Sequence, residues 1–367
     1  MKRYIILVAA VALATVSCSK TYDTNKNAEA MPISMTTWKS AMTKAPLSSF
    51  AVNDTLDVFG YKWKGTANAQ TDPVTVFDGT DVKQTSTGVW EYAGINSQTL
   101  KYWDPSYDGY TFFAAYPNDI LATAPAQTGL FVSNSLTYDG ADEKLLVAQK
   151  KVVDTKPFGA TVELHFKHCG ALVDFKFKKH ADLEDAVVTV TSFSLANIKT
   201  VGAYEVASYD ASSNDPVGAT VSEVAGLGWT PAGTVNATPA AAPYLNDSDV
   251  ALAAATGITT GTAADLISNL VVMPQKLLTG SGSQTFTIEY TIEDESHQVN
   301  TYAPDPIEIG QFDKVDDTDN EDAKFPAWMP GVHYTYYITI NANKIVFSAE
   351  IDPWVTTDAT GYYYILN

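Results

Sequence analysis

Short runs of β-branched and aromatic residues, separated by Gly, Pro, Asn and Asp, recur along this chain of 367 residues. Such runs are typical of β-strands bounded by turns, and their number indicates a sandwich or a barrel. A doubly wound parallel sheet is not indicated, because helical periodicity is almost absent. We therefore predict an all-β fold. The clearest predicted strands are Thr55–Trp63, Tyr110–Tyr116, Val162–His168, Ala171–Lys178, Val187–Leu195, Thr285–Ile292, Tyr334–Ile340 and Ile345–Ile351.

The segment between Lys199 and Lys276 differs from the rest of the chain. It carries no basic side chain and is rich in Ala, Gly, Thr and Pro, which predicts long loops. One short helix is predicted within it, over Thr262–Leu270, because a threonine that can cap a helix precedes the sequence AADLISNL.

A change in side-chain alternation indicates a boundary near the middle of the chain. In Val162–His168 the apolar residues fall on even numbers, whereas in Ala171–Lys178 they fall on odd numbers. Successive side chains of a strand point to opposite faces, so the change at Cys169–Gly170 requires a bulge or passage of the chain to another sheet or domain. The length also favours two domains. We predict domains at residues 31–169 and 170–367.

The first residues have the layout of an export signal. Lys2 and Arg3 precede an apolar run, Tyr4–Val16, that is too short to span a bilayer as a helix. Cys18 directly follows the small Ser17, an arrangement that resembles the cleavage site of bacterial lipoproteins, in which the cysteine is acylated and becomes the first mature residue.

We therefore predict a signal peptide at residues 1–17, palmitate on Cys18, and a polar tether at residues 18–30. Thr15 and Val16 depart from the lipoprotein pattern, in which leucine and a small residue are commoner at these places. A cleaved secretory signal without a lipid is the alternative.

The charge of the chain excludes one class of partner. Its 42 acidic and 23 basic side chains give a formal net charge of −19, which repels a phosphate backbone. Nucleic-acid binding is therefore excluded, and anionic membrane surfaces are disfavoured. Arg3 is the only arginine, so removal of residues 1–17 leaves a mature chain without one. If Cys18 is lipidated, Cys169 is the only free thiol, and no internal disulfide can form.

His165, His168 and Cys169 are residue types that bind metals. Residues three apart on a regular strand point to opposite faces, however, and His168 shares the parity of the apolar residues, which indicates a buried histidine. The acidic run Asp313–Asp322 does not fit a calcium loop, because Asp322 would stand where the turn glycine is required. We predict no metal site and no cofactor.

The catalytic signatures GxSxG, GxxxxGK[ST], HExxH and CxxC are all missing from the sequence. Acid pairs for glycoside hydrolysis depend on a three-dimensional separation, and nothing in the sequence favours them. We predict no catalytic residue and no enzymatic activity. The 7 tryptophans and 20 tyrosines are expected mainly in the core, with sugar binding by exposed rings as the alternative.

Seven motifs follow the signal in a fixed order. They are PISM (Pro32–Met35), YKW (Tyr61–Trp63), YWDPSYDGYTFFAAYP (Tyr102–Pro117), LLVA (Leu145–Ala148), LHFKH (Leu164–His168), VVMPQ (Val271–Gln275) and WMPGVHYTYYITI…IVFSAEIDPW (Trp328–Trp354). In their order and spacing they resemble the fimbrillin-like family. The members of this family are the major fimbrial subunits and relatives that build type V pili in anaerobic Gram-negative gut and oral bacteria.

The resemblance implies two tandem transthyretin-like β-sandwich domains and a lipoprotein precursor at the outer membrane. In the family, a trypsin-like, arginine-specific protease cleaves the loop after the first strand, which releases the lipid and that strand. The vacated groove then accepts the C-terminal strand of another subunit. Here the first strand is expected to include Ile33 and Met35. Lys44–Ala45 takes the place of the processing site, although an arginine-specific pocket is expected to reject lysine.

The donor strand implied by the resemblance is GYYYILN, residues 361–367. An added strand satisfies both an apolar groove and its unpaired backbone groups. This one supplies five large apolar side chains in a row, namely Tyr362, Tyr363, Tyr364, Ile365 and Leu366. A final strand that packs within its own domain is the alternative.

We predict a structural and adhesive fimbrial subunit, exported as a lipoprotein to the cell outer membrane, present in the fimbrium once processed, and assembled by strand exchange. Its expected partners are other fimbrial subunits in a homo- or heteropolymer, the outer membrane through the lipid, and a host or bacterial surface ligand. The alternative is a monomeric glycan- or host-ligand-binding lipoprotein with its site in the loops of residues 200–262. A glycoside-active enzyme is a distant third.

Overall fold

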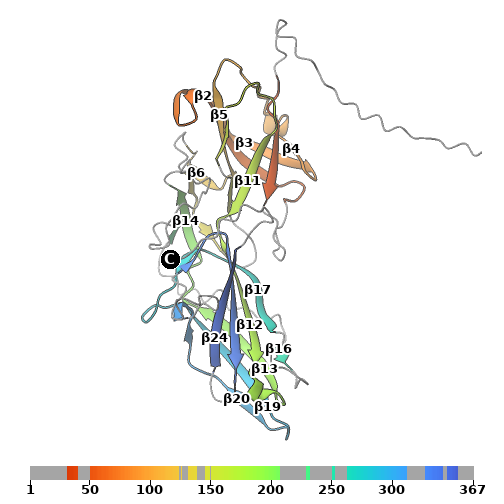
Figure 1. Cartoon of the computed structure of the whole chain (residues 1–367), viewed down its shortest axis with the longest axis vertical. Coiled ribbons are helices and arrows are strands. Elements are labelled where there is room, and N and C mark those ends of the chain that lie inside the picture. Colours follow the sequence, from red (N-terminus) through yellow and green to blue (C-terminus); the bar gives the residue numbers. More distant parts are fainter. Residues whose placement is uncertain are drawn as a thin grey trace, which may run out of the picture.

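The computed structural model confirms the all-β prediction (Figure 1). It describes residues 31–39, 50–123, 125, 131–138, 145–148, 150–206, 229–231, 250–252, 263–311, 327–341 and 345–353. All eight strands predicted above are present, as β2 (Thr55–Thr66), β5 (Gly109–Tyr116), β11 (Val162–His168), β12 (Ala171–Lys179), β13 (Val187–Ala196), β19 (Thr285–Glu293), β23 (Val332–Ile340) and β24 (Ile345–Pro353). The only helices in the described segments are short 3-10 turns, η1 (Ile95–Ser97), η2 (Ala181–Leu183) and η4 (Ile309–Gln311). None of them is long enough to cross a membrane.

An eight-stranded sheet forms one end of the molecule and is built from residues before Cys169 (Figure 1). Its order is β1 (Met35–Lys39), β11 (Val162–His168), β9 (Leu146–Ala148), β5 (Gly109–Tyr116), β2 (Thr55–Thr66), β3 (Ala69–Ser86) and β4 (Val89–Glu91), and β10 (Lys151–Val153) also pairs with β5. Its apolar side chains form the first core, which includes Leu56, Phe77, Phe112, Leu164 and Phe166.

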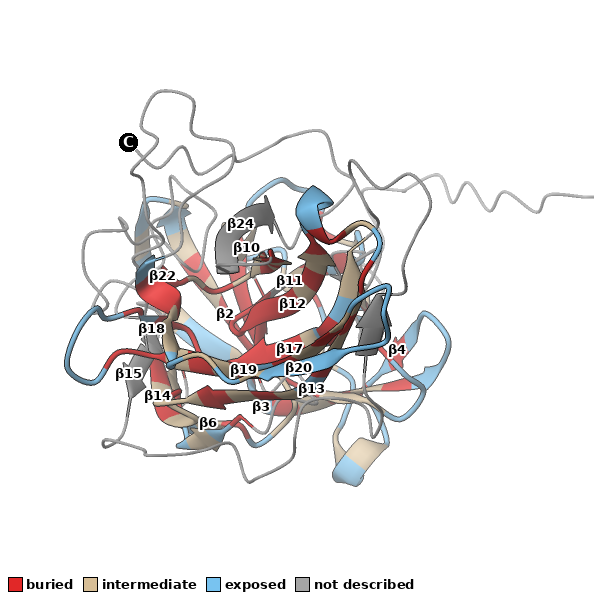
Figure 2. Cartoon of the chain, turned by 90° about the horizontal axis from the view of Figure 1, so that it is seen from below, coloured by how far each residue is buried: buried red, intermediate tan, exposed pale blue. Residues whose placement is uncertain are grey.

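Two sheets at the other end pack against each other. The first has the order β17 (Ala264–Val272), β12 (Ala171–Lys179), β23 (Val332–Ile340) and β24 (Ile345–Pro353). The second has the order β16 (Val250–Leu252), β13 (Val187–Ala196), β19 (Thr285–Glu293) and β20 (Val299–Tyr302), with β21 (Ile307–Glu308) on β19. In Figure 2 buried residues follow β12 and β17, whereas β20 is exposed.

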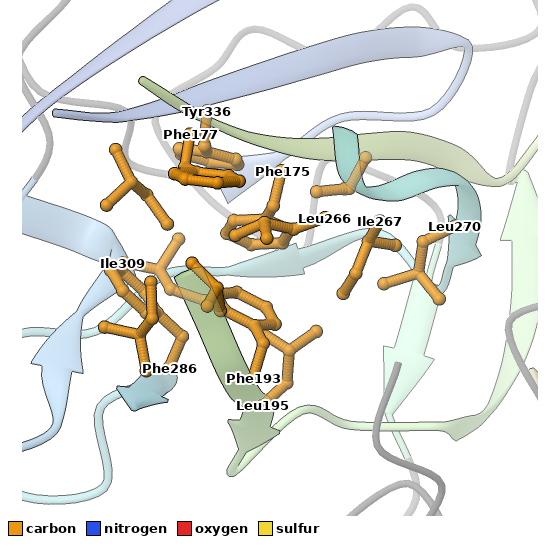
Figure 3. Close-up of a cluster of buried hydrophobic side chains, with 14 of the residues drawn as sticks. Phe175, Phe177, Phe193, Leu195, Leu266, Ile267, Leu270, Phe286, Ile309 and Tyr336 are labelled. Carbon is orange, nitrogen blue, oxygen red and sulfur yellow. The ribbon is translucent and has the colours of Figure 1, made fainter. Parts of the chain in front are cut away.

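Aromatic rings from both sheets meet in the second core (Figure 3). The ring of Phe175 on β12 lies 5.0 Å from that of Phe193 on β13 and 5.0 Å from that of Tyr336 on β23. Phe193 in turn stacks on Phe286 of β19 at 5.4 Å. Because ring pairs of this kind stabilise beyond the area that they bury, they hold the two sheets face to face.

A further sheet joins the two halves of the chain. Its order is β15 (Trp229–Pro231), β14 (Val201–Val206), β7 (Phe131–Ser133) and β6 (Leu121–Thr123), with β8 (Leu136–Thr137) on β14. A two-stranded ladder, β18 (Gln275–Lys276) with β22 (Ala327–Trp328), completes the described strands. A third core cluster likewise combines both halves, with Phe59 and Phe113 on one side and Leu172 and Val271 on the other.

The change of alternation at Cys169–Gly170 marks a passage between sheets. Val162, Leu164 and Phe166 of β11 belong to the first core. Ala171, Val173, Phe175 and Phe177 of β12 belong to the second core. The chain therefore leaves one sheet and enters another within two residues. The domain limits at residues 31–169 and 170–367, and the transthyretin-like character of each unit, stay predictions.

The predicted helix over Thr262–Leu270 is wrong, because Ala264–Val272 is the strand β17, paired antiparallel with β12. The buried residues Leu266, Ile267 and Leu270 are spaced as on one helix face, which explains the prediction. In the strand, the register with β12 shifts twice and Asn269 has a φ of 61°, so bulging replaces regular alternation. Pairing across the sheet overrides the local signal.

A buried carboxyl group lies on β2 beside the third core cluster. Asp57 is 7 % exposed and lies opposite Asp81 of β3 in the register, and the backbone N–H of Asp119 donates to its Oδ2 at 2.8 Å. Burial, with smaller contributions from the nearby Asp119 and Asp81 carboxylates, raises the pKa of Asp57 to about 6. An ionised Asp57 at neutral pH therefore destabilises the fold.

We predict that Asp57→Asn stabilises the protein at pH 7.5 and not at pH 4. The folded protein holds the Asp57 proton up to about pH 6, whereas an unfolded aspartate releases it near 3.8, so wild-type stability falls as pH rises between these values. The gain is on the order of 2 kcal/mol, measured by urea unfolding at both pH values. The exposed Asp154→Asn serves as a control and should follow the wild type. An equal gain at both pH values would contradict the prediction.

Candidate functional site

The first described strand lies at the edge of the eight-stranded sheet. β1 pairs in parallel with β11, with Met35 opposite Val162 and Lys39 opposite Phe166. The strand order of this sheet starts at β1 and ends at β4, yet β1 also lies beside β4. The sheet therefore curls until its two ends approach, and β1 lies between β11, with which it pairs, and β4 at the opposite end.

The residues just before β1 pair with a different part of the chain. The backbone N–H of Ile33 donates to Lys101 O at 2.8 Å, and that of Trp103 donates to Met31 O at 2.9 Å. From the next residue onward the partner is β11, since Val162 N–H donates to Ser34 O at 2.8 Å. One short segment thus bonds the backbone on both sides. We call the space between Lys101–Trp103 and β11 the first-strand slot.

Apolar side chains of this segment alternate inward. Ile33 is 1 % exposed, Met35 is 5 % exposed, and both belong to the first core, while Met31 packs against it. Pro32, between Met31 and Ile33, and Ser34, between Ile33 and Met35, are exposed. Complete burial of an apolar side chain of this size stabilises by about 1.5–3 kcal/mol, so Ile33 and Met35 alone give the segment substantial affinity for the slot. Of the two residues expected in the first strand, Met35 begins β1, whereas Ile33 lies two residues before it.

Tyr92 provides a polar contact inside the slot. Its side chain is 4 % exposed, and its hydroxyl donates to Ile33 O at 2.9 Å while it accepts from Lys101 N–H at 3.1 Å. Burial raises the pKa of this tyrosine, so the hydroxyl keeps its proton and remains a donor. The ring is fixed by an edge contact with Phe77 at 5.3 Å.

Gly159 forms part of the slot opposite the start of the segment. Its φ is +142°, and a β-carbon there would overlap the methyl end of the Met31 side chain. The neighbouring Phe158 stacks on Trp103 at 5.4 Å, which ties this wall to the Lys101–Trp103 side of the slot. The slot accepts a long side chain at its first position because residue 159 has none.

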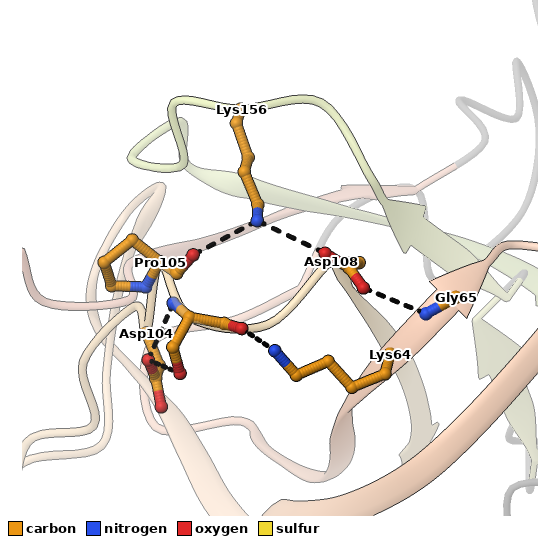
Figure 4. Close-up of polar contacts among 7 residues, drawn as sticks. Lys64, Gly65, Asp104, Pro105, Asp108 and Lys156 are labelled. Atoms are coloured by element: carbon orange, nitrogen blue, oxygen red, sulfur yellow. Dashed lines mark hydrogen bonds and ion pairs between the residues drawn. The ribbon is translucent and has the colours of Figure 1, made fainter.

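A network of lysines and carboxylates fixes the loop that follows Trp103 (Figure 4). The ammonium of Lys62 bonds the Asp104 carboxylate at 2.8 Å, and this contact, helped by Ser106, holds the pKa of Asp104 at about 2. Asp108 accepts from Gly65 N–H at 3.0 Å and pairs with Lys156 at 3.4 Å. Because the loop is tied to β2, the backbone of residues 101–103 is held ready to pair.

The histidines do not assemble into a cluster. His168 is buried, in agreement with its parity, whereas His165 is partly exposed and lies 3.5 Å from Glu163. Cys169 is buried. Over the described ranges, no group of three or more His, Cys, Asp or Glu side chains is arranged to hold a metal ion.

Several predicted positions lie outside the described residues. They are Cys18, Lys44, Ala45, the acidic run Asp313–Asp322, the donor residues Tyr362, Tyr363, Tyr364, Ile365 and Leu366, and most of the loops in residues 200–262. Sequence reasoning missed Tyr92, Gly159 and the pairing role of Lys101–Trp103. The motif that begins at Tyr102 was a signal for the last of these, whereas Tyr92 and Gly159 stand in no motif.

Comparison with known proteins identifies the relatives of this chain. A sequence model for the family described as fimbrillin-like matches residues 43–354. A solved fimbrial protein from Bacteroides vulgatus ATCC 8482 is 16 % identical over 88 % of this chain and 99 % of its own, with a TM-score of 0.54, and therefore shares the fold. No curated protein matches the chain in sequence.

A second solved structure is similar over the same extent. It is a proposed cell adhesion protein from Bacteroides uniformis ATCC 8492, 16 % identical, with 88 % of this chain and 99 % of that chain covered and a TM-score of 0.44.

We predict that Ile33→Ala lowers the free energy of unfolding by about 2–4 kcal/mol, because it leaves a cavity in the first core. The neighbouring Ser34 is the matched control, since it is exposed and its hydroxyl bonds only the exposed Thr161 hydroxyl, at 3.0 Å. Ser34→Ala should cost less than about 0.5 kcal/mol. Urea unfolding of both variants makes the comparison, and equal losses would mean that the segment is not held by its buried side chains.

Proposed function

The chain belongs to the fimbrillin-like family, and from that membership we propose that it is a structural and adhesive fimbrial subunit, exported as a lipoprotein and assembled by strand exchange. The family is one of fimbrial and cell adhesion proteins, which supports a location at the cell surface and a polymer with other subunits as partners. A structural role without enzymatic activity accords with both.

The observation that carries the proposal is the two-sided pairing of the first strand. The segment from Met31 to Lys39 bonds Lys101–Trp103 on one side and β11 on the other, and it buries Ile33 and Met35. Its removal would expose an apolar groove and unpaired N–H and C=O groups together. An extended strand from another chain satisfies both, which is the physical basis of strand addition.

The strand that fills the groove comes, in this proposal, from the C-terminus of another subunit. Tyr362, Tyr363, Tyr364, Ile365 and Leu366 supply five large apolar side chains. At about 1.5–3 kcal/mol for each side chain that is fully buried, the gross gain is about 7–15 kcal/mol before entropy and desolvation. Even half of this would make a durable junction between subunits.

Export and anchoring come first in time. The signal at residues 1–17 is removed, Cys18 carries the lipid, and residues 18–30 connect the outer membrane to the fold. Cleavage after the first strand then separates the subunit from its anchor. The site in this chain is Lys44–Ala45, and the absence of arginine from the mature sequence requires a protease whose acidic pocket tolerates lysine.

We predict that polymerised protein purified from the cell surface begins at Ala45, because only cleavage at Lys44 releases both lipid and first strand. Mass spectrometry of the N-terminal peptide makes the measurement. Lys44→Gln should abolish the cut and Lys44→Arg should preserve it. Intact lipidated Cys18 in filaments would exclude a stalk role and favour an accessory or anchor subunit.

We also predict that deletion of residues 361–367 abolishes filaments and the ladder of multimers on gels, because it removes the proposed donor strand. Electron microscopy of surface fractions and gel electrophoresis of unheated samples make the measurement. Filaments that persist would mean that the final strand stays in its own domain. Glycan binding that survives the deletion in a chain that never forms filaments would support the ligand-binding lipoprotein instead.

A further inference from the structure

We propose that Tyr92 and Gly159 determine which strand occupies the first-strand slot and in which register. This inference rests on the proposed function, since it takes the slot as the site of exchange. The proposed occupant is the strand Tyr362–Leu366 of a second copy of this chain. Tyr362 takes the position that Met31 holds when the slot contains the chain's own first strand.

Tyr92 contacts the backbone of the strand that occupies the slot. Its hydroxyl donates to the carbonyl of Ile33, and it stays bonded to Lys101 from within the sheet. A backbone carbonyl is common to every strand, so this contact selects no side chain. It requires a carbonyl from a residue whose side chain points inward, so it fixes the alternation of the occupant, and the pocket at Gly159 then fixes the register.

Gly159 leaves space for the first inward side chain of the occupying strand. The methyl end of Met31 lies where a β-carbon of residue 159 would be, and the stacked rings of Trp103 and Phe158 stand beside it. An occupant with a long side chain at this position fills the space, whereas one with glycine leaves a cavity. Empty volume in an apolar site is destabilising, so the pocket discriminates by size.

The direction of the occupant follows from the pairing on both sides. The segment is antiparallel to Lys101–Trp103, with a bridge between Pro32 and Tyr102, and parallel to β11. A replacement that makes both sets of bonds must run in the same direction as β1. The residue at the place of Pro32 needs no N–H donor, because proline has none and is exposed there.

These requirements choose between the two alternations of the C-terminal strand. One places Gly361, Tyr363 and Ile365 inward, and the other places Tyr362, Tyr364 and Leu366 inward. Only the second puts a large side chain against Gly159 and keeps apolar residues at the next two inward positions. Tyr362 therefore takes the pocket of Met31.

The first test measures release of the resident strand. Arg3 is the only arginine, so Lys44→Arg gives the mature full-length chain a single site for an arginine-specific protease. After cleavage, the rate at which the fragment ending at residue 44 leaves is followed by size-exclusion chromatography and mass spectrometry, in enough urea that release is complete. Tyr92→Phe should accelerate release about fivefold to tenfold, through loss of one buried hydrogen bond.

The matched control is Tyr61→Phe. Tyr61 is also buried and its hydroxyl also donates to a backbone carbonyl, that of Pro125, at 2.5 Å, but it belongs to the third core cluster. In the Tyr61→Phe variant the release rate of the fragment should stay within about twofold of the rate in the parent protein. Equal acceleration by both variants would overturn the role of Tyr92.

The second test measures selection by size. A labelled peptide of residues 31–44 is bound to the emptied chain, with and without Gly159→Val. The substitution should weaken the wild-type peptide about tenfold, and a peptide that carries Met31→Gly much less. An equal loss for both peptides would mean that Gly159 acts through its backbone alone, which overturns the pocket.

The third test uses peptides of residues 361–367 on the same emptied chain. Tyr362→Ala should weaken binding about tenfold, and Tyr363→Ala less than threefold. The reverse order would overturn the register. If neither this peptide nor its variants bind, while the 31–44 peptide rebinds in a Tyr92-dependent manner, then the C-terminal strand is not the donor. In that case the proposed function fails, whereas the roles of Tyr92 and Gly159 in selecting the strand in the slot stand.

Discussion

The hydrogen bonds from Ile33 N–H to Lys101 O and from Val162 N–H to Ser34 O determine the organisation of this end of the molecule. A sheet has two edges, and each unpaired edge exposes backbone groups that another chain can bind. Here the sheet curls until β1 lies beside both β11 and β4, so a single short segment protects both ends. The closure of the fold and the strand exchange proposed above therefore depend on the same backbone contacts.

The proposed exchange requires that this segment can leave without loss of the rest of the core. Only Met31, Ile33 and Met35 come from it, whereas the remaining members of the first core lie between Phe50 and Phe166. The receiving backbone is also supported independently, because the loop after Trp103 is tied to β2 by Lys62 and Asp104. A groove supported in this way would keep its shape during the proposed exchange, which would reduce the ordering cost of binding.

The parts of the fold that depend on residue type and local pattern were predictable from the sequence. Runs of β-branched and aromatic residues between turn residues located the eight main strands, and the change of parity at Cys169–Gly170 located the passage between sheets. The pattern failed at Leu266, Ile267 and Leu270, where irregular register in β17 imitates helical spacing. Tyr92 and Gly159 were not predictable, because their roles arise from a hydroxyl and an absent side chain that face Ile33 and Met31 only after folding. The residue types alone contain no such information.

The short connection between β11 and β12 has a mechanical consequence. β11 receives the strand in the slot, and only Cys169 and Gly170, both buried, separate it from β12 in the middle of the second unit. Gly331 N–H also bonds Gly170 O at 2.7 Å, which braces the connection. Tension along a strand in the slot would act in shear on all its hydrogen bonds to β11 at once. The force would then pass from β11 directly into β12. A fibre built from such units would be stiff along its length, with its load carried by backbone and not by a flexible linker.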